Sequence, residues 1–231
     1  MKKIPWIITI LLLAGTAIII PYLPDQIATH FDLSGTVDDR GSKYILFLFP
    51  AIQLLMTIIM TVFIIYLEKK RTEGVDDKKA ANAHANAKVM EILTIVMSLL
   101  FVTIEAIVIG ISFKGEKVEN MGMAATRLSM LSMGLILIVV GNLMPKTRKN
   151  WIVGIRLPWS IYNDTTWSKT HRFGGAALMV GGAITILGAA ILPNEALILT
   201  TMFVALMLSV IVTMVYSYKV YKEEKRKTAS E

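Results

Sequence analysis

Residues 150–172 contain the side chains of this chain that are best suited to bind another molecule. The segment reads NWIVGIRLPWSIYNDTTWSKTHR and holds three of the four tryptophans. Its cationic and imidazole side chains are Arg156, Lys169, His171 and Arg172. Tryptophan offers a large apolar ring with one N–H donor, and arginine offers a planar fork of five donors. These residue types predict a binding surface rather than a catalytic site.

A second group of candidate residues lies in apolar sequence. Glu105 is eight residues from the end of an apolar run, or about 12 Å deep at ~1.5 Å per residue. An ionised acid deep in a membrane costs about 3 kcal/mol on insertion scales, so we expect this carboxyl to be neutral, paired or beside a polar cavity. Gln53 lies at a matching depth, and Arg127 could reach both. We predict a polar site of these three residues, with a single interhelical hydrogen bond as the alternative.

A third group lies between the first two apolar runs. It includes Asp25, His30 and Asp38, in a segment where we expect turns around Gly35 and Gly41. Such ligands could hold a cation, but their spacing does not match a calcium-binding loop. A solvated, ordered loop that packs on the helix ends is the alternative interpretation. The chain has no cysteine, which excludes disulfides and thiolate metal sites. We expect neither a metal nor a cofactor.

The elements that position these residues are predicted to be membrane-spanning helices. Hydrophobic residues make up 55% of the chain and charged residues 18%, and the mean hydropathy is +0.61. A spanning helix needs about 20 apolar residues. Six runs satisfy this length, at residues 4–20, 44–67, 89–113, 128–144, 173–192 and 197–218. The fold class is therefore all-α: a polytopic membrane protein with six transmembrane helices.

The distribution of positive charge predicts the orientation of these helices. Of the 24 Lys and Arg residues, 19 fall on one side of the predicted spans and five on the other. Short loops rich in Lys and Arg stay in the cytoplasm. Both termini and the segment 145–172 are therefore expected to be cytoplasmic. Lys2 and Lys3 precede the first run as in a signal peptide, but no cleavage site follows, so we expect a retained helix.

The spans divide the chain into four parts. Residues 1–67 form a two-helix unit with an external loop at 21–43, residues 68–88 a cytoplasmic loop, residues 89–218 a four-helix unit with a cytoplasmic motif at 141–172, and residues 219–231 a basic cytoplasmic tail. Alanines near the end of the 68–88 loop favour an early start of the third helix.

Small residues predict how the last two helices pack. Gly174, Gly181 and Gly188 recur every seven residues in the fifth run. Small side chains on one face let helix backbones approach closely within a membrane. A short turn at residues 193–195 then makes an antiparallel hairpin of the fifth and sixth helices.

The order of residues in the cytoplasmic motif carries information that a lipid anchor does not need. It resembles the SdpI family, in which Gly-Asn is followed by Asn-x-x-x-Gly-Ile-Arg-x-Pro-Trp and then by Trp-x-Lys-x-His-Arg. The matching residues are Gly141, Asn142, Asn150, Gly154, Ile155, Arg156, Pro158, Trp159, Trp167, Lys169, His171 and Arg172. The external loop is similar to the uncharacterised domain that often begins these proteins.

The resemblance implies a non-enzymatic immunity protein that protects against a secreted membrane-active toxic peptide. It also implies capture of a small winged-helix repressor at the membrane, with no direct contact to nucleic acid. We assign partner binding to Asn142, Asn150, Gly154, Arg156, Pro158, Trp159, Trp167, Lys169, His171 and Arg172. We assign toxin sensing to Asp25, His30, Asp38, Gln53, Glu105 and Arg127. Anionic lipid is a further expected partner, because Arg and Lys beside the membrane attract its headgroups.

Two other functions remain as alternatives. A transporter that exports a toxic peptide would need six helices in a dimer, although the inverted halves of many transporters are not evident. A lipid- or peptide-modifying enzyme would use Glu105, His171 or the external acids. The sequence shows no serine–histidine pair, no paired intramembrane acids and no His-Glu-x-x-His.

Overall fold

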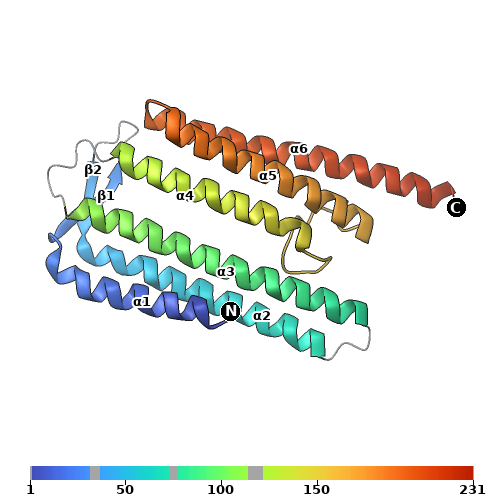
Figure 1. The fold of residues 1–231 in the computed structure, drawn as a ribbon, viewed down its shortest axis with the longest axis horizontal. Helices are drawn as coiled ribbons and strands as arrows, with labels where there is room; N and C mark the ends of the chain where they lie inside the picture. Colours follow the sequence, from blue (N-terminus) through green and yellow to red (C-terminus); the bar gives the residue numbers. More distant parts are fainter. Residues whose placement is uncertain (1, 32–36, 73–76, 114–121, 231) are drawn as a thin grey trace.

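The computed structural model describes residues 2–31, 37–72, 77–113 and 122–230 (Figure 1). Its elements follow in the order α1 Lys3–Ile19, η1 Ile20–Tyr22, β1 Gln26–Phe31, β2 Val37–Ser42, η2 Lys43–Phe47, α2 Leu48–Thr72, α3 Asp77–Ser112, α4 Gly122–Leu143, η4 Met144–Lys146, α5 Asp164–Ile191 and α6 Glu195–Ser230. The helices lie side by side in one bundle, with the β-hairpin at one end and the α4–α5 connection at the other (Figure 1).

Six helices in the described residues are long and apolar enough to cross a membrane, which confirms the predicted fold class. Large apolar side chains such as Leu11, Ile18, Leu187 and Ile191 remain exposed on their outer faces. Lipid cannot hydrogen-bond to a backbone, so a helix that satisfies its own N–H and C=O groups is the favoured spanning element. The protein is a multi-pass membrane protein.

The predicted loop at residues 21–43 contains an antiparallel hairpin. Gln26 pairs with Ser42 and Ile27 with Gly41. Gly41 therefore lies inside β2, and the turn predicted there is wrong; Gly35 lies outside the described residues. A Cβ added at Gly41 would come within 2.8 Å of Thr29 Cγ2, so glycine serves close cross-strand packing here rather than a turn.

The hairpin is fixed to the ends of the first three helices. Ile27 and Leu46 are almost fully buried, at 1% and 0% exposure, and they form one cluster with Leu23. Val108 and Ile109 of α3 pack against this cluster. The described part of the 21–43 segment is thus joined to α3 by apolar contacts.

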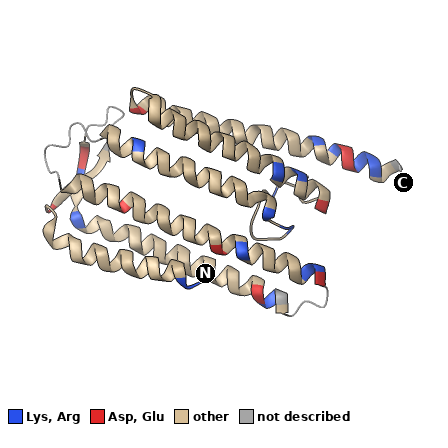
Figure 2. Ribbon diagram, in the orientation of Figure 1, with Lys and Arg blue, Asp and Glu red and all other residues tan. Residues whose placement is uncertain are grey.

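Several helices extend beyond the predicted spans, and α3 and α6 do so by the greatest length. α3 begins at Asp77, which confirms the early start of the third helix and makes much of the predicted 68–88 loop helical. α6 continues to Ser230, so residues 219–230 of the predicted tail are a helical extension. Figure 2 shows that Lys and Arg gather at the end of the bundle that holds these extensions and the α4–α5 connection.

Glycines allow α4, α5 and α6 to pack closely. A Cβ added at Gly182 of α5 would lie 2.6 Å from the carbonyl oxygen of Gly134 in α4. One added at Gly181 would lie 2.7 Å from Ser209 Oγ in α6. Adjacent residues of α5 therefore face different neighbours. The predicted packing of the fifth helix on the sixth is confirmed, and a second glycine face packs on α4.

Candidate functional site

The central part of the motif 141–172 folds as a non-helical loop between η4 and α5. Residues 147–163 contain no helix, and Pro158 in this segment is unfavourable in a helix interior because it lacks a backbone N–H. α5 then begins with a capping box. The Asn163 side chain accepts from the Thr166 N–H at 2.8 Å, and the Thr166 hydroxyl accepts from the Asn163 N–H at 3.0 Å. These bonds satisfy backbone donors that the first helical turn leaves open.

A stacked pair of side chains from α5 packs against the loop and bonds to its backbone. The rings of Trp167 and His171 lie 4.0 Å apart between centroids, with an interplanar angle of 23°. The Trp167 indole N–H donates to the carbonyl oxygen of Thr147 at 3.1 Å. Both residues are buried, with 2% and 0% exposure. The pair therefore forms the core on which the loop folds.

His171 uses both ring nitrogens to hold backbone. Nε2 accepts from the Ile155 N–H at 2.8 Å, and Nδ1 lies 2.8 Å from the Trp167 carbonyl oxygen. Because a backbone N–H only donates and a carbonyl only accepts, the neutral ring must carry its proton on Nδ1. The side chain of His171 is therefore enclosed and positions the loop, and its predicted part in partner binding stays a prediction.

Gly154 provides the backbone shape that brings the loop against this pair. Its φ is +124°, the one positive φ among the described residues. An added Cβ would lie 2.8 Å from the Trp167 ring and would also collide with His171 Nε2. Glycine alone combines this φ with the absence of a side chain. The glycine in the Gly-Ile-Arg sequence is thus explained by packing.

Two polar side chains fold the loop on itself. Asn150 Oδ1 accepts from the N–H groups of Ile152 and Val153, at 2.6 and 2.8 Å. The Ser160 hydroxyl, at 0% exposure, donates to the Ile155 carbonyl at 2.8 Å. Asx and Ser side chains commonly stabilise turns in this way. Asn150 therefore has a structural role in the loop, and its predicted part in partner binding stays a prediction.

The loop is joined to α3. The Asn86 amide donates to the Arg148 carbonyl at 3.1 Å, and its oxygen accepts from the Arg148 N–H at 2.8 Å. Asn86 is 1% exposed. Lys78 Nζ lies 2.9 Å from Asp164 Oδ2 on the neighbouring surface. Asn86 lies in an alanine-rich stretch that indicates only a helix, so its contact with the loop could not be predicted from the sequence.

The loop and the start of α5 are also joined to α6. Trp159 packs edge to face on Tyr218, with centroids 5.5 Å apart. Thr170 and Ser217 share a buried hydrogen bond of 2.7 Å. Lys169 Nζ lies 3.6 Å from Glu224 Oε1. Trp159 and Lys169 are therefore half-buried packing residues with only part of their surface open to a partner.

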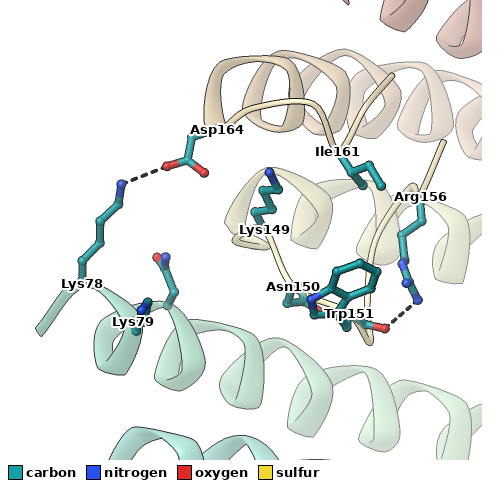
Figure 3. Close-up of a pocket in the computed structure, with 9 residues that line it drawn as sticks. Lys78, Lys79, Lys149, Asn150, Trp151, Arg156, Ile161 and Asp164 are labelled. Carbon is teal, nitrogen blue, oxygen red and sulfur yellow. Dashed lines mark hydrogen bonds and ion pairs between the residues drawn. The ribbon is translucent and has the colours of Figure 1, made fainter. Parts of the chain in front are cut away.

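The outer face of the motif retains a smaller set of the predicted binding residues. Arg156, Pro158 and Arg172 are exposed, as is Asn142 near the end of α4. Arg156 donates to the Trp151 carbonyl at 2.5 Å, and its guanidinium lies 5.4 Å from the centroid of that indole (Figure 3). Trp151 is 77% exposed. This arginine–tryptophan pair is the clearest accessible binding feature of the loop.

The intramembrane polar site differs from the prediction. Thr16 of α1 donates to Glu105 Oε1, whereas Gln53 Nε2 donates to Thr9 Oγ1 at 3.1 Å. Arg127 donates to the Leu192 carbonyl at 3.1 Å. The prediction that Glu105, Gln53 and Arg127 contact one another in one polar site is therefore wrong. Two turns of α1 separate the residues that bind Glu105 and Gln53.

This part of the bundle nevertheless buries unusual polar groups. Glu105 and Gln53 are each 1% exposed. Within the described residues, Glu105 Oε2 and Gln53 Oε1 have no hydrogen-bond partner. A buried acceptor without a donor costs roughly 1–3 kcal/mol. Both residues therefore remain candidates for sensing, through contacts with different parts of α1.

The external candidates lie on the hairpin and beside it. His30 Nδ1 lies 2.6 Å from Asp38 Oδ1 on the exposed surface of the β-hairpin. Asp25 pairs with Lys43 at 3.0 Å. Across the described part of the chain, no group of three or more His, Cys, Asp or Glu residues is arranged to hold a metal ion.

Comparisons with known proteins match both ends of the chain. Residues 146–217 match the SdpI/YfhL protein family, and residues 7–54 match a domain of unknown function, DUF1648. Over 93 residues the chain is 33% identical to Immunity protein SdpI of Bacillus subtilis (strain 168). That alignment covers 40% of this chain and 44% of the relative. No solved structure matches the chain.

The two matches agree with the geometry. The SdpI/YfhL segment contains the folded loop, α5 and most of α6, and the DUF1648 segment contains most of α1, the hairpin and the start of α2. The resemblance seen in the sequence is thus confirmed: in this multi-pass membrane protein, residues 146–217 are similar to the SdpI/YfhL family and residues 7–54 are similar to DUF1648.

Proposed function

We propose that this chain is a membrane immunity protein that protects its cell from a secreted, membrane-active toxic peptide. The observation that carries the proposal is the match of residues 146–217 to the SdpI/YfhL family. The relative named Immunity protein SdpI supports it. Because less than half of that relative is aligned, its role is transferred to this chain as a proposal.

The proposal includes an orientation in the cell membrane. We place both termini and the folded loop in the cytoplasm and the β-hairpin outside, because 19 of the 24 Lys and Arg residues fall on the proposed inner side. The hairpin and loop lie at opposite ends of the bundle (Figure 1). Under this orientation a toxic peptide would meet the hairpin or the apolar helix faces, and a cytoplasmic protein would meet the loop.

We assign toxin sensing to the α1–α3 region and the hairpin. His30 and Asp38 offer an exposed polar pair there. Glu105 and Gln53 offer buried acceptors with spare capacity. α3 is one helix of 36 residues whose outer end packs on the hairpin cluster and whose inner end bonds to the loop through Asn86. It is therefore the element most suited to connect the two ends.

We assign partner capture to the accessible face of the loop. Trp151 and Arg156 are exposed there on a backbone that internal hydrogen bonds hold in place, and Arg172 is exposed on α5. A pre-ordered surface loses less entropy when a partner binds than a flexible one does. The proposed partner is a winged-helix repressor protein that is held at the membrane when toxin is present.

We propose that this role is not enzymatic. The residue most typical of acid–base catalysis, His171, is buried and has both ring nitrogens committed to backbone groups. A general base must lie within hydrogen-bond reach of its substrate. The enclosed imidazole supports a structural role instead.

The experiment is a survival assay in a toxin-sensitive strain that lacks its own immunity gene. Cells that express this chain are challenged with the sporulation-delaying toxic peptide, the class of secreted toxin that the resemblance to the SdpI family implies. We expect them to survive concentrations that kill cells carrying an empty vector or a membrane protein of similar size. Unchanged survival, with the protein present in the membrane, would contradict the proposal.

A further inference from the structure

A cavity of about 480 Å³ lies between the first turns of α3, the folded loop and the start of α5 (Figure 3). Lys78 and Lys79 of α3, and Lys149 and Arg156 of the loop, contribute four cations to its lining. The one carboxylate in the lining, Asp164, pairs with Lys78 at 2.9 Å. Four cations and one carboxylate leave an excess of three positive charges around the cavity.

The placement of the lysines strengthens the electrostatic argument. Lys78 and Lys79 occupy the first turn of α3, which begins at Asp77. The N-terminus of a helix carries partial positive charge, which makes cations there unfavourable. An anion in the cavity would be attracted to both the helix end and the lysines. The fold thus concentrates positive potential that its own side chains neutralise only in part.

The donors suit a phosphate group. Arg156 uses one terminal nitrogen on the Trp151 carbonyl, which leaves other N–H groups of its fork. Arginine binds phosphate through paired N–H donors, and lysines add mobile point charges. In Figure 3 Lys149, Lys79 and Arg156 come from separate sides of the same space. One anion could therefore contact α3 and the loop together.

We propose that this cavity binds the phosphate headgroup of an anionic phospholipid. Trp151 and Ile161 also line it, so apolar surface stands beside the cations. Tryptophan is enriched at the headgroup level of membranes. An amphiphilic phosphate uses both kinds of surface, whereas a small soluble phosphate uses only the charges. The bound headgroup would tie the start of α3 to the loop at the place where Lys78 already meets Asp164.

The test is lipid binding to the purified full-length protein in neutral detergent, measured by native mass spectrometry with phosphatidylglycerol. Phosphatidylcholine and soluble glycerol 1-phosphate are the comparison ligands. The pocket variant is the double substitution Lys79→Gln and Lys149→Gln. The matched control is Lys222→Gln with Lys225→Gln, which removes the same charge from α6, where these lysines lie over Tyr218 and Tyr221.

We expect phosphatidylglycerol to bind the wild-type protein in preference to both comparison ligands. The pocket variant should bind it roughly tenfold more weakly than the control variant, because only the pocket variant removes cations that line the cavity. Diffuse attraction depends on the number of charges and not on their place, so it would weaken binding equally in both variants. Equal weakening in the two variants would overturn the proposal and leave only general attraction. Equally tight binding of glycerol 1-phosphate would overturn the lipid assignment in favour of a soluble phosphate ligand. Gel filtration of both variants excludes misfolding as the cause.

Discussion

The two halves of the bundle differ in how closely their helix backbones approach, although side-chain hydrogen bonds cross helices in both, as between Thr170 and Ser217. In the α1–α3 half, side chains bond across helices: Thr9 with Thr57 at 3.1 Å, and Thr16 with Glu105. In the α4–α6 half, glycines bring backbones into direct contact, as Gly182 does with Gly134. Side-chain bonds can change partners, whereas close backbone packing leaves no alternative arrangement. The α1–α3 half is therefore the more adaptable unit, and the α4–α6 half is the more rigid one.

The two halves also differ in their buried polar atoms. In the described residues of the first half, buried acceptors on Gln53 and Glu105 lack donors, whereas the unpartnered buried atoms of the second half are the donors Arg127 Nε and Trp159 Nε1. Around the folded loop of the second half, His171, Asn150 and Ser160 are all engaged with backbone groups. We therefore assign sensing to the half with spare acceptors, and presentation of a loop fixed by hydrogen bonds to the other.

The largest expected effect on stability is at the glycine contacts. Gly182→Ala places a methyl group against the backbone of α4, and overpacking of this kind costs roughly 1–3 kcal/mol. Gly110→Ala is the matched control, because nothing lies within 4 Å of its added Cβ and alanine is favoured over glycine in a helix by about 1 kcal/mol. Thermal unfolding in detergent should shift down for the first and not for the second. Equal shifts would remove the proposed difference between the halves.

The second effect concerns the loop backbone. Gly154→Ala forces a side chain into a positive φ and against Trp167. Such strain costs roughly 1–3 kcal/mol, and we expect the loop to open locally. Hydrogen exchange should rise at residues 147–163 and stay unchanged in α1 and α2. Unchanged exchange in the loop would show that Gly154 does not fix its shape.

The third effect separates a structural histidine from a binding one. His171→Phe keeps an aromatic ring against Trp167 but removes the acceptor of the Ile155 N–H. An unsatisfied buried donor costs roughly 1–3 kcal/mol. The exposed neighbour is the control: Arg172→Gln should change stability by less than about 0.5 kcal/mol. If the two variants melt alike, the buried role of His171 is incorrect.

The fourth effect tests the adaptable half. Glu105→Leu removes one hydrogen bond between α1 and α3, worth roughly 0.6 kcal/mol within a membrane, so folding should be nearly normal. If Glu105 senses the toxic peptide, survival under challenge should still fall. Glu105→Gln retains an oxygen acceptor for Thr16 and serves as the matched variant. Normal survival of the leucine variant at normal expression would exclude the sensing role.

The smallest expected effect on stability is at the exposed arginine. Arg156→Lys keeps the charge but removes the fork that bonds to the Trp151 carbonyl and faces its ring. Insertion and unfolding should match the wild type, while recruitment of a fluorescent repressor to the membrane should fall. Normal recruitment in both Arg156→Lys and Trp151→Ala would reduce this surface to a lipid anchor.

The sequence predicted the helices better than the site. Long apolar runs define spanning helices because a bilayer has a fixed thickness, and all six are present. The residue order also pointed correctly to the SdpI family. Within the motif, however, types alone could not separate a binding histidine from a packing one. That distinction depends on the loop backbone at Ile155 bonding to His171 and on the Trp167 ring stacking against it. No local sequence pattern reveals these contacts.

The intramembrane prediction failed for a related reason. Matching depth in two spans suggested contact between Gln53 and Glu105, but depth does not define which face of each helix meets which neighbour. α1 lies close enough to both α2 and α3 for its threonines to bind each of them separately. The role of Asn86 could not be predicted because its two hydrogen bonds go to loop backbone that lies 62 residues further along the chain.

The proposed roles of the hairpin in sensing and of the loop in partner capture require that the two face opposite sides of the membrane. The chain has no cysteine, so single cysteines can be introduced without removing others. Asp39 and Trp151 are exposed at the two ends, whereas Ser160, at 0% exposure, is unsuited to labelling. In intact cells an impermeant maleimide should label Asp39→Cys, and it should label Trp151→Cys only after the cells are permeabilised. Labelling of Trp151→Cys in intact cells would contradict the orientation, and with it a loop that binds a cytoplasmic partner.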